Sequence, residues 1–196
     1  MPDNTNDFTR FLADTNAVKF GHFILKSGKE SPVFFDFGQI VYGKELIELG
    51  KFFADFIVEN SLQNVDVLFG PAYKGINIAI AVSIGLYEKY GISLPIAYNR
   101  KVPKDHAEGG NFVGFDLSKA KSVLILDDVF TDGGTKYEAI NMLSGFKGLS
   151  VRAVIIGVDR QEIDASGKSY LSEFKNKTGI NVFALTTKEK MLSLKN

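Results

Sequence analysis

The stretch VLILDDVFTDGGTKYEA, residues 123–139, joins a buried strand to a helix and decides the fold. Its apolar run ends at Asp127, so we expect Asp127 and Asp128 at the carboxyl end of a central strand, where open α/β sheets bind their ligands. Residues 131–135 then form a short polar loop that opens a helix, and the free N–H groups of a helix start suit a phosphate. The stretch therefore predicts a ligand site that joins two carboxylates to an anion-binding loop.

Helix capping is the simpler interpretation of this loop. Thr131 or Asp132 could cap the helix, and the two aspartates could merely end the strand. Capping accounts for one of the three acids, and the loop matches neither the Walker pattern nor Gly-x-Gly-x-x-Gly. Paired carboxylates beside a phosphate loop are better explained by a ligand that offers hydroxyls, developing positive charge or bound Mg²⁺ as well as phosphate. A sugar phosphate is such a ligand.

Short β-branched segments alternate with helical segments from about Val65 onward. The strands are expected at residues 65–69, 94–98, 122–128, 151–159 and 180–185, and helices at 45–60, 74–91, 135–148 and 169–179. Because such alternation is typical of βαβ units, it predicts a twisted parallel sheet with helices on both faces. In the first helix the apolar side chains share one face: Leu46, Leu49, Phe53, Phe56 and Ile57.

The N-terminal region lies outside this alternation. Residues 20–38 hold two aromatic-rich strand candidates around a Ser, Gly and Pro turn region, which predicts a β-hairpin. The chain has 196 residues, which suits a single domain: an N-terminal segment of about 1–40 and an α/β core of about 41–196. The polar segment 100–111 is expected to be a surface loop of that core.

Composition restricts the partners. Lys plus Arg and Asp plus Glu both number 23, so no net charge attracts nucleic acid or an anionic membrane. Cysteine is absent, which excludes disulfides and thiolate metal sites. The N-terminus has no signal-peptide pattern, and the longest apolar stretch, 76–87, is far short of the roughly 20 residues that span a bilayer. We therefore expect a soluble, cytoplasmic protein with no nucleic-acid or membrane partner.

The strand, the two acids and the Thr and Gly loop resemble the signature of the type I phosphoribosyltransferases. The resemblance implies an α/β fold with a central parallel sheet flanked by helices on both faces, and a small N-terminal hood that contains the β-hairpin. It implies that the loop binds the 5-phosphate of phosphoribosyl pyrophosphate (PRPP) and that the acids address the ribose hydroxyls. The implied PRPP-binding positions in this stretch are Asp127, Asp128, Val129, Phe130, Thr131, Asp132, Gly133, Gly134 and Thr135. Relatives often carry a small or hydroxyl residue at position 132, so the role of Asp132 is open.

Two segments resemble the orotate phosphoribosyltransferases within this family. In FILKSGKESPVFFDFG, residues 23–38, the resemblance assigns Lys26 to both substrates and Phe34 and Phe35 to the orotate pocket. It also assigns to orotate Thr131 and Arg160, which follows a predicted strand, and an arginine can grip a planar carboxylate through two parallel hydrogen bonds. The alternatives are a Phe pair in the core and an exposed Arg160 that pairs with Asp159 or Glu162.

Two further segments carry basic residues. In FGPAYKGI, residues 69–76, Tyr73 and Lys74 follow a strand, and the resemblance assigns this turn to the pyrophosphate of PRPP. Segment 100–111 resembles the lid loop that closes over the active site of the neighbouring subunit, which implies a homodimer. In this lid the residues implied to bind PRPP are Arg100, Lys101, Lys104 and His106. Taken alone, a basic residue in either segment would more often be solvent-exposed.

The resemblance implies that orotate and PRPP give orotidine 5-phosphate and pyrophosphate in pyrimidine (UMP) biosynthesis. Mg²⁺ is the implied cofactor, bound mainly through PRPP oxygens, with Asp127 or Asp128 as the candidate protein ligands. We expect Lys74, Lys104 and His106 to stabilise the departing pyrophosphate, and Asp127 and Asp128 to stabilise the cationic ribose ring. Two alternatives remain: a phosphoribosyltransferase for another nucleobase, and a non-catalytic nucleotide-sensing regulator on the same fold.

Overall fold

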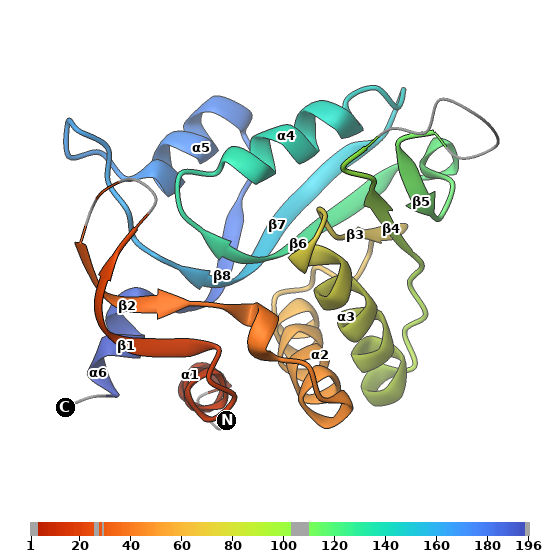
Figure 1. The fold of residues 1–196 in the computed structure, drawn as a ribbon. Helices are drawn as coiled ribbons and strands as arrows, with labels where there is room; N and C mark the ends of the chain where they lie inside the picture. The colour runs from red at the N-terminus through yellow and green to blue at the C-terminus, as the bar shows by residue number, and fades with distance from the viewer. Residues whose placement is uncertain (1–3, 26–27, 29, 103–109, 195–196) are drawn as a thin grey trace.

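The computed structural model describes residues 4–25, 28, 30–102 and 110–194, and its core is a six-stranded sheet (Figure 1). The strand order is β5-β4-β3-β6-β7-β8. The parallel strands are β3 (Val67–Phe69), β4 (Ile96–Asn99), β6 (Ser122–Phe130), β7 (Ser150–Asp159) and β8 (Val182–Thr187). The expected parallel sheet is therefore confirmed. The short edge strand β5 (Phe112–Gly114) was not expected, and it runs antiparallel to β4.

Helices cover both faces of this sheet. On one face lie α1 (Asn4–Asp14), α2 (Gly43–Glu59), α3 (Lys74–Tyr90) and α6 (Lys188–Ser193), and on the other α4 (Gly134–Leu143) and α5 (Tyr170–Thr178) (Figure 1). Alternate residues of β6 serve the two cores: Leu124 and Leu126 face the first, whereas Val123 and Ile125 face the second. A strand buried on both faces reads as a continuous apolar run, which explains the sequence that precedes Asp127.

Helices α2 and α3 pack with their backbones in contact. A Cβ atom on Gly50 would lie 2.1 Å from the Ala81 carbonyl oxygen, so only glycine fits there. The expected α2 stripe is confirmed, because Leu49, Phe53 and Ile57 are buried and Leu46 and Phe56 are partly buried against the same core. None of the helices in the described ranges is long and apolar enough to cross a membrane.

The N-terminal hood contains the expected hairpin, an antiparallel pair of β1 (Val18–Ile24) and β2 (Glu30–Phe35), which forms its own two-stranded sheet. A short 3-10 helix, η1 (Phe37–Gln39), connects it to α2, and a second one, η2 (Leu117–Lys119), precedes β6. Apolar side chains of α1, β1 and β2 belong to the same hydrophobic cluster as α2 and α3. This packing fixes the hood next to the carboxyl ends of the parallel strands. The candidate site lies between the hood and these strand ends.

Candidate active site

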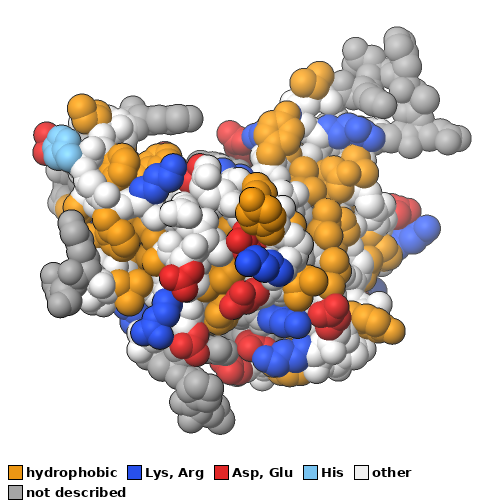
Figure 2. Space-filling view, turned by 60° about the horizontal axis from the view of Figure 1, so that its bottom comes forward, with side chains coloured by type: hydrophobic (Ala, Val, Ile, Leu, Met, Phe, Trp, Pro, Cys, Tyr) orange, Lys and Arg blue, Asp and Glu red, His pale blue; other side chains and the backbone are white. Residues whose placement is uncertain are grey.

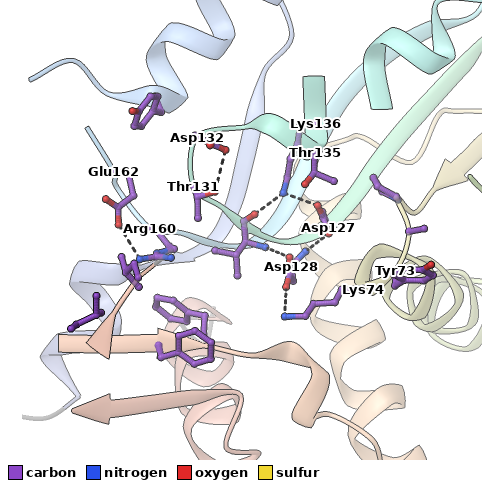
Figure 3. A pocket seen from close by; sticks show the side chains of 18 residues that line it. Tyr73, Lys74, Asp127, Asp128, Thr131, Asp132, Thr135, Lys136, Arg160 and Glu162 are labelled. Atoms are coloured by element: carbon purple, nitrogen blue, oxygen red, sulfur yellow. Dashed lines mark hydrogen bonds and ion pairs between the residues drawn. The ribbon is translucent and has the colours of Figure 1, made fainter. Parts of the chain in front are cut away.

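A pocket of about 710 Å³ lies between the hood and the carboxyl ends of the parallel strands (Figure 3). The hood contributes Ile24, Leu25, Phe34 and Phe35; the turn after β3 contributes residues 71–74. The remaining lining comes from the β6 to α4 segment and from the region after β7: Asp127, Asp128, Val129, Thr131, Asp132, Thr135, Lys136, Arg160, Glu162 and Tyr170. Most of the predicted site residues that the structure describes therefore surround one cavity.

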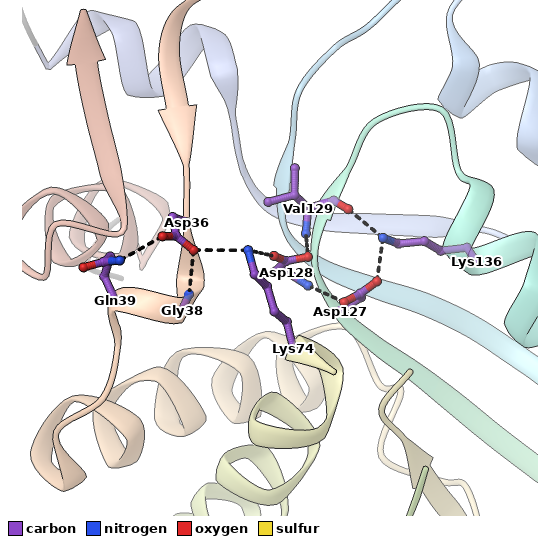
Figure 4. A network of polar contacts seen from close by, with 8 residues as sticks. All are labelled: Asp36, Gly38, Gln39, Lys74, Asp127, Asp128, Val129 and Lys136. Atoms are coloured by element: carbon purple, nitrogen blue, oxygen red, sulfur yellow. Dashed lines mark hydrogen bonds and ion pairs between the residues drawn. The ribbon is translucent and has the colours of Figure 1, made fainter. Parts of the chain in front are cut away.

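Asp127 is buried and pairs with a lysine that the sequence interpretation did not single out. Its Oδ2 lies 2.6 Å from the Nζ of Lys136, which also donates a 2.6 Å hydrogen bond to the Val129 carbonyl oxygen (Figure 4). Asp127 Oδ1 accepts a hydrogen bond from the backbone N–H of Asp128 at 3.0 Å. Burial raises the pKa of Asp127; Lys136 opposes this rise, and the neighbouring Asp128 charge adds to it.

Asp128 lies in a more open part of the pocket. Its Oδ2 is 3.2 Å from the Nζ of Lys74, and the same Nζ is 3.3 Å from Oδ1 of Asp36, at the end of β2 (Figure 4). Partial burial disfavours the charge on Lys74, but the two carboxylates outweigh it and raise the pKa of Lys74. A hydrogen bond from Gln39, opposed by partial burial and helped by Lys74, lowers the pKa of Asp36. One lysine thus links the hood to the carboxylate at the end of β6.

The loop that starts α4 has a defined local structure. Gly133 has φ 84°, and a Cβ atom there would lie 2.9 Å from the Phe130 ring, so the loop needs glycine at this position. Asp132 Oδ1 accepts a 2.9 Å hydrogen bond from the Gly134 N–H, so this acid turns back onto the start of the helix. The Phe130 side chain is buried against Phe174, with ring centroids 5.5 Å apart, which leaves only its backbone for a ligand in the pocket.

Arg160 lines the side of the pocket away from Tyr73 and Lys74 (Figure 3). Its side chain is only 12% exposed, and Nη2 lies 3.1 Å from Glu162 Oε1. The pairing with Glu162 was one of the alternatives, but the arginine is in the pocket wall and not on an open surface. Within the described residues its buried Nε has no hydrogen-bond partner. Phe34 is partly exposed towards the cavity, whereas Phe35 is mostly buried.

The remaining predicted residues fall into three groups. Tyr73 and Lys74 line the pocket, and Asn99 fixes their turn by accepting a 2.9 Å hydrogen bond from the Ala72 N–H. Arg100 and Lys101 follow β4 and do not line this pocket. Lys26, Lys104 and His106 lie outside the described residues.

Four contributors were missed from the sequence: Lys136, Asp36, Asn99 and, as a pocket residue, Glu162. Lysines and acids are usually exposed, so their residue types alone gave no reason to bring them into the site. The position of Lys136, one residue after the Thr and Gly loop, was the only available signal.

Comparison with known proteins agrees with this geometry. The family model of the phosphoribosyl transferase domain matches residues 37–188. Orotate phosphoribosyltransferase of Clostridium acetobutylicum is 37% identical over 98% of this chain and 86% of its own length. The Pseudomonas fluorescens enzyme of the same name is 41% identical over 95% of this chain and 86% of its length. The crystal structure of the orotate phosphoribosyltransferase from Francisella tularensis superposes with a TM-score of 0.82 and 36% identity, covering 96% of this chain and 89% of that one.

The chain belongs to the phosphoribosyltransferase family, with the α/β fold and the strand-end pocket described above. Within that family it belongs with the orotate phosphoribosyltransferases, which it matches over nearly its whole length.

Proposed function

We propose that this protein transfers the phosphoribosyl group of PRPP to orotate, forming orotidine 5-phosphate and pyrophosphate in UMP biosynthesis. The observation that carries the proposal is the set of groups around one pocket: an arginine and Phe34, two strand-end carboxylates, a lysine, and a Thr and Gly loop at a helix start. These groups match the carboxylate, the ribose, the pyrophosphate and the 5-phosphate of the two substrates.

The chemistry follows from this arrangement. Orotate nitrogen attacks ribose carbon 1 while the bond to pyrophosphate breaks, and positive charge develops on the ring. Asp128, and the buried Asp127 behind it, supply negative potential beside that ring. Lys74 leaves its acidic partners to neutralise the pyrophosphate, which carries more charge than either carboxylate.

Arg160 is the proposed discriminator for orotate. Its buried Nε, for which the described residues offer no acceptor, gives it spare capacity for a planar carboxylate. We expect Arg160→Met to raise the KM for orotate at least roughly tenfold. Arg152→Met, at an exposed position on the same strand, is the matched control and should leave that KM unchanged.

A homodimer with a lid shared between subunits is part of the proposal. Arg100 and Lys101 do not line the pocket of their own chain, as expected if segment 100–111 acts on a neighbouring copy. The face that carries α2 and α3 displays hydrophobic side chains, among them Ile80, Ile84 and Tyr87 of α3, which suits subunit contact (Figure 2). Lys26, Lys104 and His106 are proposed substrate contacts, the latter two at the departing pyrophosphate.

Mg²⁺ is the proposed cofactor and the cytoplasm the proposed location. The two carboxylates offer the oxygen ligands that Mg²⁺ prefers, although each already contacts a lysine. The pocket therefore fits a Mg²⁺ ion held mainly by PRPP and water, with Asp128 the more accessible protein oxygen. When bound, the ion would neutralise charge on the pyrophosphate.

The direct test is Mg²⁺-dependent conversion of orotate with PRPP, followed by the loss of orotate absorbance. A parallel panel should contain uracil and hypoxanthine. We expect turnover of orotate and little or none of the other two bases. Preferred turnover of another base, or pyrophosphate release with no base at all, would contradict the proposal. So would a folded, dimeric sample that leaves orotate unchanged.

A further inference from the structure

Lys136 and Asp127 are the two least exposed charged residues of the pocket wall, each with 4% of its surface accessible. Lysine is rarely buried unless its charge and its donors have partners. Both conditions are met here, because Nζ lies 2.6 Å from a carboxylate oxygen and 2.6 Å from a backbone carbonyl oxygen. The contact is therefore built into the interior and is not a chance pairing on the surface.

Both acceptors lie near the carboxyl end of β6, Asp127 through its side chain and Val129 through its backbone carbonyl. Lys136 itself is in the first turn of α4, directly after the phosphate loop. One ammonium group thus ties the start of α4 to the end of β6 across that loop, as Figure 4 shows.

Stability alone is a weak explanation for this contact. A buried ion pair has a desolvation cost that its attraction often only balances. In this protein we infer that the pair serves to fix a particular geometry. The geometry in question is the distance between the strand-end carboxylates and the start of α4. In the proposed function these two features bind the ribose and the 5-phosphate of the same PRPP molecule.

We propose that Lys136 is a positioning residue for the phosphoribosyl donor. It holds Asp127 back from the ligand and fixes the Val129 carbonyl, so that Asp128 is the carboxylate that meets the ribose and the loop is preformed for the 5-phosphate. This role rests on the proposed binding of PRPP in the pocket. Lys136 contacts the protein groups that hold the ligand and is not itself assigned to the reaction.

The test compares two ligands that share one part of the site. PRPP would use the loop and the carboxylates in addition to the Lys74 turn, whereas inorganic pyrophosphate would use the turn but neither the loop nor the carboxylates. Binding of each, in the presence of Mg²⁺, is measured by titration calorimetry for the natural protein and for Lys136→Met. Lys147→Met removes an exposed lysine beyond the end of α4 and is the matched control.

We expect Lys136→Met to weaken PRPP binding at least tenfold while changing pyrophosphate binding less than twofold, and Lys147→Met to change neither. Unchanged PRPP affinity, or an equal loss for both ligands, would overturn the role of Lys136. If Lys136→Met does not fold, Lys136→Gln, which keeps a donor without the charge, is used with the same two criteria. Failure of the natural protein to bind PRPP would instead count against the proposed function.

Discussion

Two neighbouring carboxylates at the end of β6 meet lysines in different surroundings. Asp127 and Lys136 form a 2.6 Å pair whose side chains are 6% and 5% exposed. Asp128 shares Lys74 with Asp36 at 3.2 and 3.3 Å, and that lysine is 44% exposed. The first contact is closed to solvent, whereas the second is open to the pocket.

The difference in burial suggests different roles for the two pairs: the buried pair maintains the structure of the site, and the exposed pair is available to a ligand. A closed pair is costly to break, because either partner left alone is a buried charge. An open pair is screened by water and contributes little to stability, so its members can exchange partners when a ligand arrives. Adjacent acids of identical chemistry can therefore take different tasks, with Asp127 maintaining the site and Asp128 meeting the ligand.

The strongest test of this comparison is Asp127→Asn. The variant leaves Lys136 buried without its counter-charge, so we expect a loss of roughly 3–5 kcal/mol in the free energy of unfolding. Urea denaturation of both proteins measures it. The matched variant Asp128→Asn should lose about 1 kcal/mol or less. Equal losses for the two variants would remove the distinction between a closed and an open pair.

For catalytic activity the expectation is different, because Asp128→Asn should cause a large loss although it changes stability little. Loss of the carboxylate that we propose faces the developing ring charge should lower kcat/KM by roughly 10²–10³-fold, the usual scale for one preorganised electrostatic group. Steady-state kinetics with orotate and PRPP test this, with Asp14→Asn at the end of α1 as a distant control. Near-normal kcat/KM in a folded Asp128→Asn protein would assign the ribose to another residue.

Lys74→Met tests the role of the solvent-exposed pair that Lys74 forms with Asp128. Removing one charge from the pyrophosphate turn should raise the KM for PRPP about tenfold, the order of one charge-assisted hydrogen bond. Stability should change little, since Lys74 is almost half exposed. Lys51→Met, which breaks an exposed pair with Glu88, serves as the control for loss of a surface lysine. An unchanged KM for PRPP would exclude Lys74 from the pyrophosphate site.

The smallest effect is expected from Asp36→Asn and depends on pH. Because its pKa is lowered in the folded protein, Asp36 stabilises the fold above its ordinary value of 3.8, and this stabilisation is lost as pH falls. The natural protein should exceed the variant by up to about 1 kcal/mol at pH 7. Unfolding titrations at several pH values should show the difference shrinking below about pH 4. A constant difference across that range would contradict the assigned role of its charge.

The prediction of the fold from sequence succeeded where burial is complete. Apolar runs such as residues 123–126 gave the parallel strands, and the spacing in 45–60 gave α2 with the correct buried face. The edge strand β5 was missed because three residues, only partly buried, carry too little pattern. Its pairing with β4 is a tertiary contact that no local signal encodes.

The residues of the candidate site likewise divide into those that the sequence predicted and those that it did not. Asp127, Asp128 and Arg160 were anticipated because each lies within two residues of the end of an apolar run, and strand ends gather at one edge of a parallel sheet. Lys136 and Asp36 were not, because a lysine and an acid are ordinarily exposed and their burial depends on partners from other elements.

The sequence by itself thus determined which groups stand at the strand ends and which residue types form the loop before α4. Those properties follow from local order along the chain: an apolar run, then acids, then hydroxyls and glycines. Only the tertiary structure decided which lysine each aspartate meets, and how deeply each pair is buried. The physical reason is that the strength of a charge pair is set by its solvent access, which depends on packing between the hood, β6 and α4.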